Sequence, residues 1–186
     1  MNQNQRERLK ELLLDLSCEQ GEFTLSSGRK SNFYFDGKQT ALNPEGAYLL
    51  GHLLFEKIRE INLSVEAVGG PTLGADPLVT AVSLVSHLQQ KPIPAFIIRK
   101  ERKQHGTEAW VEGFRNLNPG MRVAIIEDVI TTGKSSLEAV QKAIDAGLNV
   151  VCIVAIIDRE EGGRQAIEEK GYRLETLFTK WELIGA

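Results

Sequence analysis

The side chains best suited to chemistry lie in residues 123–136, where an apolar run is followed by two carboxylates and then by a hydroxyl-rich turn. The apolar run, Val-Ala-Ile-Ile, is typical of a strand that is covered on both faces. Glu127 and Asp128 come next, and residues 131–136 combine hydroxyls, a glycine and a lysine ahead of a helical run at 137–146. The N-terminus of a helix carries free N–H groups and partial positive charge, so it can bind a phosphate. The pattern predicts a ribose-phosphate site, with the carboxylates facing sugar hydroxyls or a divalent cation.

Two common nucleotide-binding motifs do not fit this chain. A P-loop needs a glycine five residues before Gly133, and Asp128 occupies that position. The other glycine-rich stretch, residues 69–74, lacks the lysine of a P-loop and contains no Gly-x-Gly-x-x-Gly fingerprint. A plain strand-to-helix connection with a Thr or Ser cap is the alternative for the turn, but an acidic pair directly before it is not typical of such a connection.

The elements that must position these residues alternate along the chain. One domain is expected, residues 1–186, with an α/β fold in which helices flank a mostly parallel central sheet. Ligands bind such sheets outside the carboxyl ends of the strands, so the glycine loop, the basic stretch at 99–103, the acidic pair and Arg159 should meet at one edge. The expected strands are 65–69, 94–99, 121–127, 149–157 and 172–178. The expected helices are 4–18, 75–90, 134–146 and 161–170. A further helix is expected to start at Asn43 and Pro44, with Leu50, Leu53, Leu54 and Ile58 on its apolar face.

The composition narrows the class of protein. With 186 residues, 42% of them hydrophobic and 25% charged, the chain is an ordinary globular one. No apolar run approaches the roughly 20 residues that span a bilayer and the N-terminus is polar, so we expect a cytoplasmic protein with no membrane partner. The net charge of −3 gives no reason to expect nucleic acid as a partner.

Cys18 lies in a predicted helix and Cys152 in a predicted strand, and their spacing is not that of a disulfide framework or a zinc site. His52 and His87 are expected to pack or face solvent.

Residues 123–136 resemble the motif that binds 5-phosphoribosyl 1-diphosphate (PRPP) in type I phosphoribosyltransferases. Three further segments narrow the resemblance to the orotate phosphoribosyltransferases. Together with residues 123–136 they occur in the order typical of that family over nearly the whole chain. They are an N-terminal signature at 23–36, a catalytic loop at 99–106 and a base-recognition turn at 158–163. The resemblance implies the type I fold, with a small N-terminal hood at about 1–40 and a PRPP-binding core at about 64–180.

The resemblance also implies an activity and the residues that perform it. The expected reaction is Mg²⁺-dependent transfer of the phosphoribosyl group from PRPP to orotate, which gives orotidine 5′-monophosphate and pyrophosphate in pyrimidine (UMP) synthesis. The implied catalytic residues are Lys100, Lys103, His105 and Asp128. The implied PRPP-binding residues are Arg99, Lys100, Lys103, His105, Glu127, Asp128, Val129, Ile130, Thr131, Thr132, Gly133, Lys134 and Ser135; the implied orotate-binding residues are Phe33, Tyr34, Thr131 and Arg159.

Mg²⁺ is expected to be held mainly by PRPP, close to Glu127 and Asp128, since carboxylate and substrate oxygens suit this hard ion. The family also implies a homodimer in which the basic loop serves the neighbouring subunit. Arg159 could hold the orotate carboxylate by bidentate hydrogen bonds, with a surface turn as the alternative. Core packing is the alternative for the aromatic residues at 33–35, and a solvated charged loop is the alternative for the basic stretch.

The chain differs from some family members at two positions, and two other functions of the same fold are alternatives. Some family members carry a lysine where Ser26 stands and another in the loop at 72–74, around Leu73; other members lack these lysines too, so we interpret the differences as variation between subgroups and not as loss of activity. A phosphoribosyltransferase for another base, such as a purine, is one alternative; Arg159 and the N-terminal signature argue against it. A PRPP-sensing regulator of the same fold is the other, and the intact basic loop argues against that.

Overall fold

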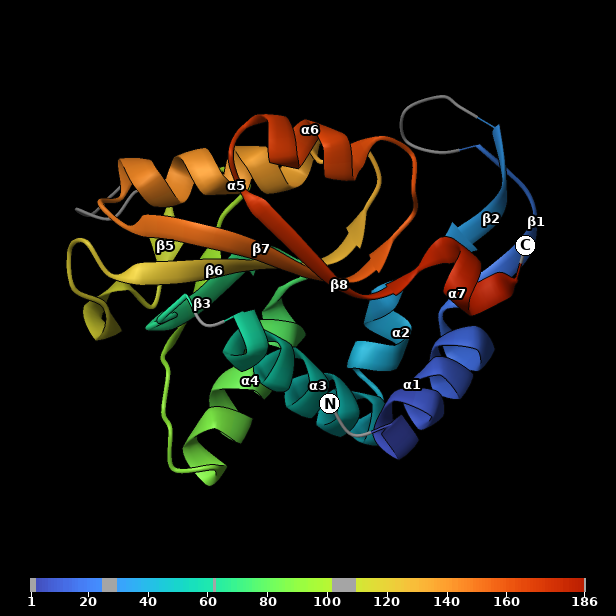
Figure 1. Cartoon of the computed structure of the whole chain (residues 1–186), viewed down its shortest axis with the longest axis horizontal. Helices are drawn as coiled ribbons and strands as arrows, with labels where there is room; N and C mark the ends of the chain where they lie inside the picture. The colour runs from blue at the N-terminus through green and yellow to red at the C-terminus, as the bar shows by residue number, and fades with distance from the viewer. Residues whose placement is uncertain (1–2, 25–29, 62, 102–109, 186) are drawn as a thin grey trace.

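The centre of the computed structural model is a six-stranded sheet, and the described residues are 3–24, 30–61, 63–101 and 110–185 (Figure 1). The strand order is β5-β4-β3-β6-β7-β8, with β5 antiparallel to β4 and every other neighbouring pair parallel. This confirms the predicted fold class. The strands are β3 (Ala67–Pro71), β4 (Ala95–Ile98), β5 (Val111–Glu112), β6 (Arg122–Ile130), β7 (Asn149–Asp158) and β8 (Arg173–Thr179).

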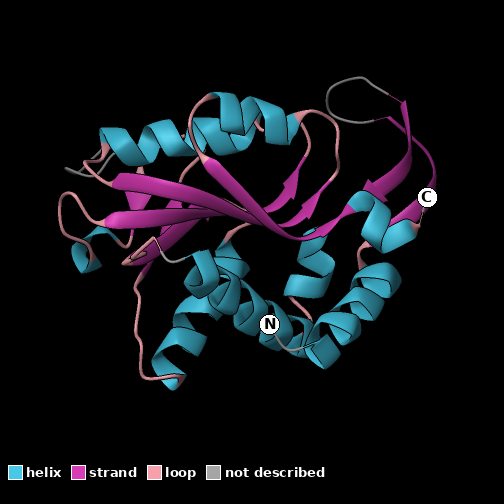
Figure 2. Cartoon of the chain, in the orientation of Figure 1, coloured by secondary structure: helices cyan, strands magenta, loops and turns pink. Residues whose placement is uncertain are grey.

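Helices cover both faces of this sheet (Figure 2). One layer contains α1 (Gln3–Leu16), α2 (Gly37–Ala41), α3 (Pro44–Ile61) and α4 (Asp76–Leu88), and the other contains α5 (Lys134–Asp145) and α6 (Gly163–Glu169). Each layer packs on its own buried apolar cluster. Alternate residues of β6 enter the two clusters, Ile125 one and Ile126 the other, which explains why the sequence of this strand is apolar without alternation. No helix within the described ranges has the length and apolar character to cross a membrane.

The start of α3 shows how local sequence fixes an element. The Oδ1 atom of Asn43 accepts hydrogen bonds from the backbone N–H groups of Glu45 (3.0 Å) and Gly46 (3.1 Å). Asn43 therefore caps the helix and Pro44 is its first residue, as predicted. The predicted apolar face is also confirmed, because Leu50, Leu53, Leu54 and Ile58 are all buried.

The N-terminal hood differs most from the prediction. Strand β1 (Cys18–Thr24) pairs with β2 (Lys30–Phe35) in an antiparallel hairpin, which lies beside the short helix α7 (Lys180–Ile184) (Figure 1). Cys18 was expected in a helix, and this was wrong because α1 stops two residues earlier and Cys18 pairs with Phe35. The prediction also missed α2, β5, the 3₁₀ turn at Phe114–Asn116 and α7, all too short to show a hydrophobic period.

Candidate active site

Strand β6 carries both candidate carboxylates. We predicted that it ends at residue 127, but its parallel pairing with β7 continues through Glu127 opposite Ala155 to Ile130 opposite Asp158. Successive side chains of a strand point to opposite faces of the sheet. The Glu127 carboxylate therefore contacts α5 and that of Asp128 lies toward α2 and the glycine loop, but the two carboxyl groups remain neighbours and still interact with each other.

Glu127 faces α5. Its Oε2 atom accepts hydrogen bonds from the hydroxyls of Ser135 (3.2 Å) and Ser136 (3.3 Å), and the residue is only 6% exposed. Burial and, to a smaller degree, the neighbouring Asp128 raise the pKa of Glu127 to about 8, against the effect of the two serine hydrogen bonds. Glu127 thus holds the start of α5 from beneath the hydroxyl-rich turn.

Asp128 faces the other layer, where two glycines approach it. A Cβ atom on Gly74 would lie 2.7 Å from the Asp128 Cγ and Oδ1 atoms, and a Cβ on Gly37 would lie 2.9 Å from the Asp128 Cβ. Burial raises the pKa of Asp128, and the ammonium group of Lys38 is the main opposing influence. Lys38, which also pairs with Asp36, is a site residue that the sequence analysis missed, since no local pattern relates it to Asp128.

The turn after β6 has the features expected of a phosphate site. Gly133 has a left-handed backbone, with φ of 76°, and is the N-cap residue of α5 without a capping side chain. Thr131, Thr132, Lys134 and Ser135 are at least partly exposed. The N-terminus of α5 and the hydroxyls of Thr131 and Thr132 are therefore available to an anion, whereas the Ser135 hydroxyl donates to Glu127.

The residues at the end of β6 have a structural role. The side chain of Ile130 is 1% exposed and packs in the core, and the Ile130 carbonyl accepts a hydrogen bond from the Arg159 N–H at 2.9 Å. Val129 is partly buried against the other cluster. Ile130 therefore supports the turn from the core, and the binding of PRPP by Val129 and Ile130 stays a prediction.

Arg159 follows β7 directly and is buried, with 5% exposure, so the surface-turn alternative is wrong. Its Nε and Nη2 atoms lie 3.0 and 2.9 Å from Oε1 of Glu161, and Nη2 donates to the Phe33 carbonyl at 3.3 Å. The sequence analysis did not select Glu161. The contact with Phe33 brings residues 158–163, the predicted base-recognition turn, against the hood.

The aromatic residues of the hood divide into two kinds. Phe33 and Phe35 are 2% and 5% exposed and belong to the core, whereas Tyr34 is 40% exposed. The ring centroid of Phe23 lies 5.4 Å from that of Tyr34. Tyr34 is therefore the residue of the Phe-Tyr-Phe run that a ligand could contact by its side chain, and core packing accounts for the other two.

A cleft of about 300 Å³ lies at the carboxyl edge of the sheet. Thr72 of the glycine loop, Lys100 of the basic stretch and Ser135 of the phosphate turn all line it, so three of the four predicted segments meet there; Arg159 does not line it. Arg99 also borders the cleft, but its Nη1 atom pairs with Oε1 of Glu112 at 2.6 Å. Ser26, Lys103 and His105 lie outside the described residues.

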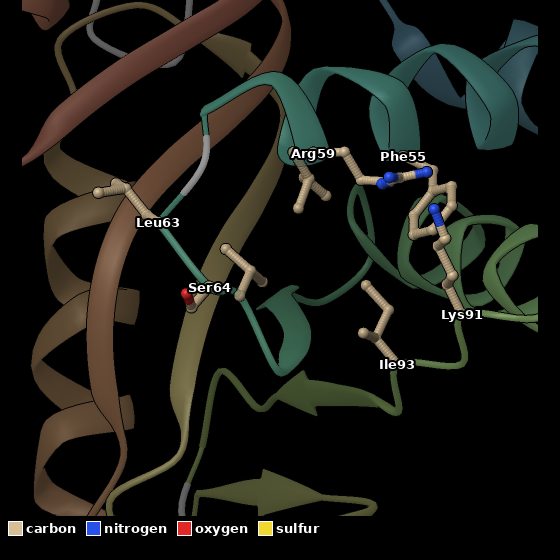
Figure 3. Close-up of a pocket in the computed structure, with 8 residues that line it drawn as sticks. Phe55, Arg59, Leu63, Ser64, Lys91 and Ile93 are labelled. Carbon is tan, nitrogen blue, oxygen red and sulfur yellow. The ribbon is translucent and has the colours of Figure 1, made fainter.

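A second hollow, of about 260 Å³, lies at the opposite edge of the sheet (Figure 3). Arg59 and Lys91 extend their nitrogen atoms toward the ring of Phe55 in this view. Both cations lie close to the C-terminal ends of helices, Arg59 in the last turn of α3 and Lys91 three residues after α4. A cation at a helix C-terminus offsets the negative end of the helix dipole, which accounts for both residues without a ligand.

Comparison with known proteins agrees with this arrangement. A model of the phosphoribosyl transferase domain matches residues 38–183. The orotate phosphoribosyltransferase of Sorangium cellulosum is 48% identical over 181 residues, which cover 97% of this chain and 94% of that protein. Two crystal structures of the orotate phosphoribosyltransferase of Mycobacterium tuberculosis H37Rv are also similar. The complex with Fe(III) dicitrate has a TM-score of 0.83 and 37% identity and covers 97% of this chain and 99% of that one. The complex with PRPP has a TM-score of 0.76 and 34% identity and covers 96% of this chain and 98% of that one. The chain therefore belongs to the phosphoribosyltransferase family, in the group of the orotate phosphoribosyltransferases.

Proposed function

We propose that this protein transfers the 5-phosphoribosyl group of PRPP to orotate, giving orotidine 5′-monophosphate and pyrophosphate for pyrimidine synthesis. The observation that carries the proposal is the position of Arg159. Its backbone N–H is bonded to the end of β6, directly before the phosphate turn, while its guanidinium is held against the hood at Phe33. A cation for the orotate carboxylate thus lies beside the turn for the ribose phosphate. The PRPP complex of the Mycobacterium tuberculosis relative adds support.

The chemistry assigns a separate task to each part of the site. Breaking the bond between C1′ and the pyrophosphate oxygen builds positive charge on the ribose and negative charge on the leaving group. The turn at 131–135 binds the 5′-phosphate through the N–H groups of α5 and its hydroxyls. The Asp128 carboxylate stabilises the sugar as positive charge develops, and Lys100 at the cleft stabilises the departing pyrophosphate.

A divalent cation fits this site only together with the substrate. Within the described part of the chain no group of three or more His, Cys, Asp or Glu residues could hold a metal ion. Mg²⁺ commonly uses one or two carboxylates plus substrate phosphates, and Asp128 would supply such an oxygen. When bound, Mg²⁺ would neutralise charge on the pyrophosphate and on the sugar hydroxyls.

For the base, we propose that Arg159 donates to the orotate carboxylate while Glu161 keeps its guanidinium in place. Arginine presents five donors in a rigid plane, a geometry that suits a planar carboxylate. Tyr34, the exposed aromatic residue of the run, supports the face of the orotate ring.

Cys18 and Cys152 are free thiols, which fits our expectation that the enzyme works in the reducing cytoplasm.

We also propose a homodimer with shared active sites. An apolar groove of about 640 Å³ between α3 and α4 is lined by exposed Tyr48, Leu84 and Leu88. The replacement Leu84→Glu should give monomers in analytical ultracentrifugation, whereas Glu138→Gln on the exposed surface of α5 should leave the assembly unchanged.

Shared sites make a quantitative prediction about mixtures. Lys103→Ala and Asp128→Asn should each inactivate the enzyme, but a mixed dimer has one site with both changes and one with neither. About half of randomly exchanged dimers are mixed, so activity should recover to about one quarter of the wild-type value per subunit. If mass spectrometry shows exchange without recovery, the basic loop acts within its own chain.

The reaction is tested by incubating the protein with PRPP and Mg²⁺ and offering orotate, uracil, adenine, guanine and hypoxanthine separately. We expect orotidine 5′-monophosphate and pyrophosphate in a one-to-one ratio, and no product with the other bases. Turnover of a purine without turnover of orotate would support a different base specificity. Binding of PRPP without turnover of any base would support the sensor alternative.

A further inference from the structure

Lys142 on α5 contacts both ends of the connection between β4 and β5. Its Nζ atom donates to the carbonyl oxygens of Arg99 (3.0 Å) and Lys100 (3.3 Å) and lies 4.3 Å from the centroid of the Trp110 ring. Arg99 and Lys100 come just after β4, and Trp110 comes just before β5. One ammonium group, with its three donors, therefore joins the two ends.

Arg99 makes further contacts at this place, including one from its Nε to the Glu101 carbonyl at 3.3 Å. The Arg99 N–H donates to the Trp110 carbonyl at 2.9 Å, and the Arg99 guanidinium pairs with Glu112 at 2.6 Å. These contacts align the ends of β4 and β5. The Lys142 bond to the Lys100 carbonyl extends the attachment to the residue that borders the cleft.

The position of Lys142 on its helix relates it to the cleft. Residues 135, 138, 139 and 142 are spaced at i, i+3, i+4 and i+7, so they share one face of α5, and all four line the cleft together with Lys100. We propose that Lys142 is a positioning residue that fixes the main chain at Arg99 and Lys100, so that the Lys100 side chain stays at the cleft for the pyrophosphate of PRPP. The inference rests on the proposed function, which assigns Lys100 to PRPP.

The decisive variant is Lys142→Met, which keeps the length of the side chain and removes the ammonium group. We expect kcat/KM for PRPP to fall about tenfold, the effect of losing a hydrogen bond from a charged donor, and KM for orotate to change less than about twofold. Lys142→Arg, which can still donate to both carbonyls, should recover most of the loss. Lys170→Met, an exposed lysine after α6, is the matched control and should behave as wild type.

A second readout follows the contact itself. In a Trp181→Phe background Trp110 is the remaining tryptophan, so its emission reports the Lys142 contact. We expect Lys142→Met to shift this emission in the free enzyme, and Lys142→Arg and Lys170→Met to leave it near that of the background.

Three results would overturn the inference. Wild-type kcat/KM for PRPP in Lys142→Met would show that the contact has no role in the reaction. A loss without a change in Trp110 emission would show that Lys142 binds PRPP directly. Equal losses for both substrates with a lower Tm would show a general structural role. Wild-type protein without transferase activity would instead contradict the proposed function, so the two failures are distinguishable.

Discussion

The two edges of the central sheet carry hollows of similar size, about 300 Å³ at the carboxyl edge and about 260 Å³ at the amino edge. The start of α5 borders the first, and the ends of α3 and α4 lie near the second. Helix dipoles therefore favour anions at the carboxyl edge and cations at the amino edge. The protein places Ser135, at the start of α5, at the first hollow and Arg59 and Lys91 at the second, which agrees with these fields.

The comparison shows that cavity volume does not identify the functional site. The direction of the strands identifies the functional site, because parallel strands bring the loops that follow them, and the N-termini of the next helices, to one edge of the sheet. Two cations beside the hollow of Figure 3 suggest an anion site when taken alone. Their position at helix C-termini supplies a sufficient reason for both charges. Substitutions at the two edges should therefore have very different effects.

The largest expected effect comes from Asp128→Asn, which removes the charge and keeps the size of the side chain. We expect kcat to fall by about 10²-fold or more, the usual effect of losing one preorganised electrostatic group. Steady-state assays with PRPP and orotate measure it, and circular dichroism checks the fold. Asp145→Asn, exposed on α5, is the matched control. Near-normal activity in folded Asp128→Asn would falsify the role of this carboxylate.

Arg159→Ala should come next. The lost partner of the orotate carboxylate should raise KM for orotate about 30-fold, the lower end of the 2–5 kcal/mol range for a broken buried charge pair, with much less change in KM for PRPP. Arg173→Ala, which removes an exposed arginine paired with Glu175, serves as control. Equal changes for both substrates would show that Arg159 is structural.

The third prediction concerns pH and stability. Because folding raises the pKa of Glu127 from 4.5 to about 8, the folded protein binds more protons than the unfolded chain between these values. The contribution of Glu127 to stability is thus complete below about pH 4.5 and is lost as the pH rises to about 8, with a slope of at most about 1.4 kcal/mol per pH unit.

Urea unfolding from pH 5 to 9 measures this slope. Glu127→Gln should lose less stability than wild type as the pH rises, because the amide does not titrate. Glu169→Gln, exposed at the end of α6, should keep the wild-type profile. If wild type and Glu127→Gln have parallel profiles, folding does not raise the pKa of Glu127 and the prediction is wrong.

The smallest effects are expected at the amino edge. Arg59→Ala combined with Lys91→Ala should change kcat and both KM values less than about twofold, since neither residue is near the carboxyl edge. Each change should lower the free energy of unfolding by less than about 1 kcal/mol, the upper end for an exposed charge at a helix terminus. Loss of PRPP binding in this variant would show that the second hollow takes part in the reaction. It would contradict our assignment of the site to the carboxyl edge alone.

Much of the fold was predictable because its signals act over a few residues. The apolar run of β6, the cap at Asn43 and the alternation of strand and helix patterns depend on backbone period and capping, which neighbouring residues determine. The short elements of the hood were not predictable, because α2 and α7 have only five residues each and a shift of register between Gln20 and Phe23 interrupts the pairing of β1 with β2.

The sequence by itself determined which segments carry the chemistry and that their loops meet at one edge of a parallel sheet. Only the tertiary structure decided how individual side chains are directed. It placed Glu127 and Asp128 on opposite faces by extending β6 to residue 130, and it joined Arg159 to Phe33 across 126 positions of sequence. It also joined Lys142 to the end of β4. Such contacts depend on strand order and on the packing of helices against the sheet, which no local pattern encodes.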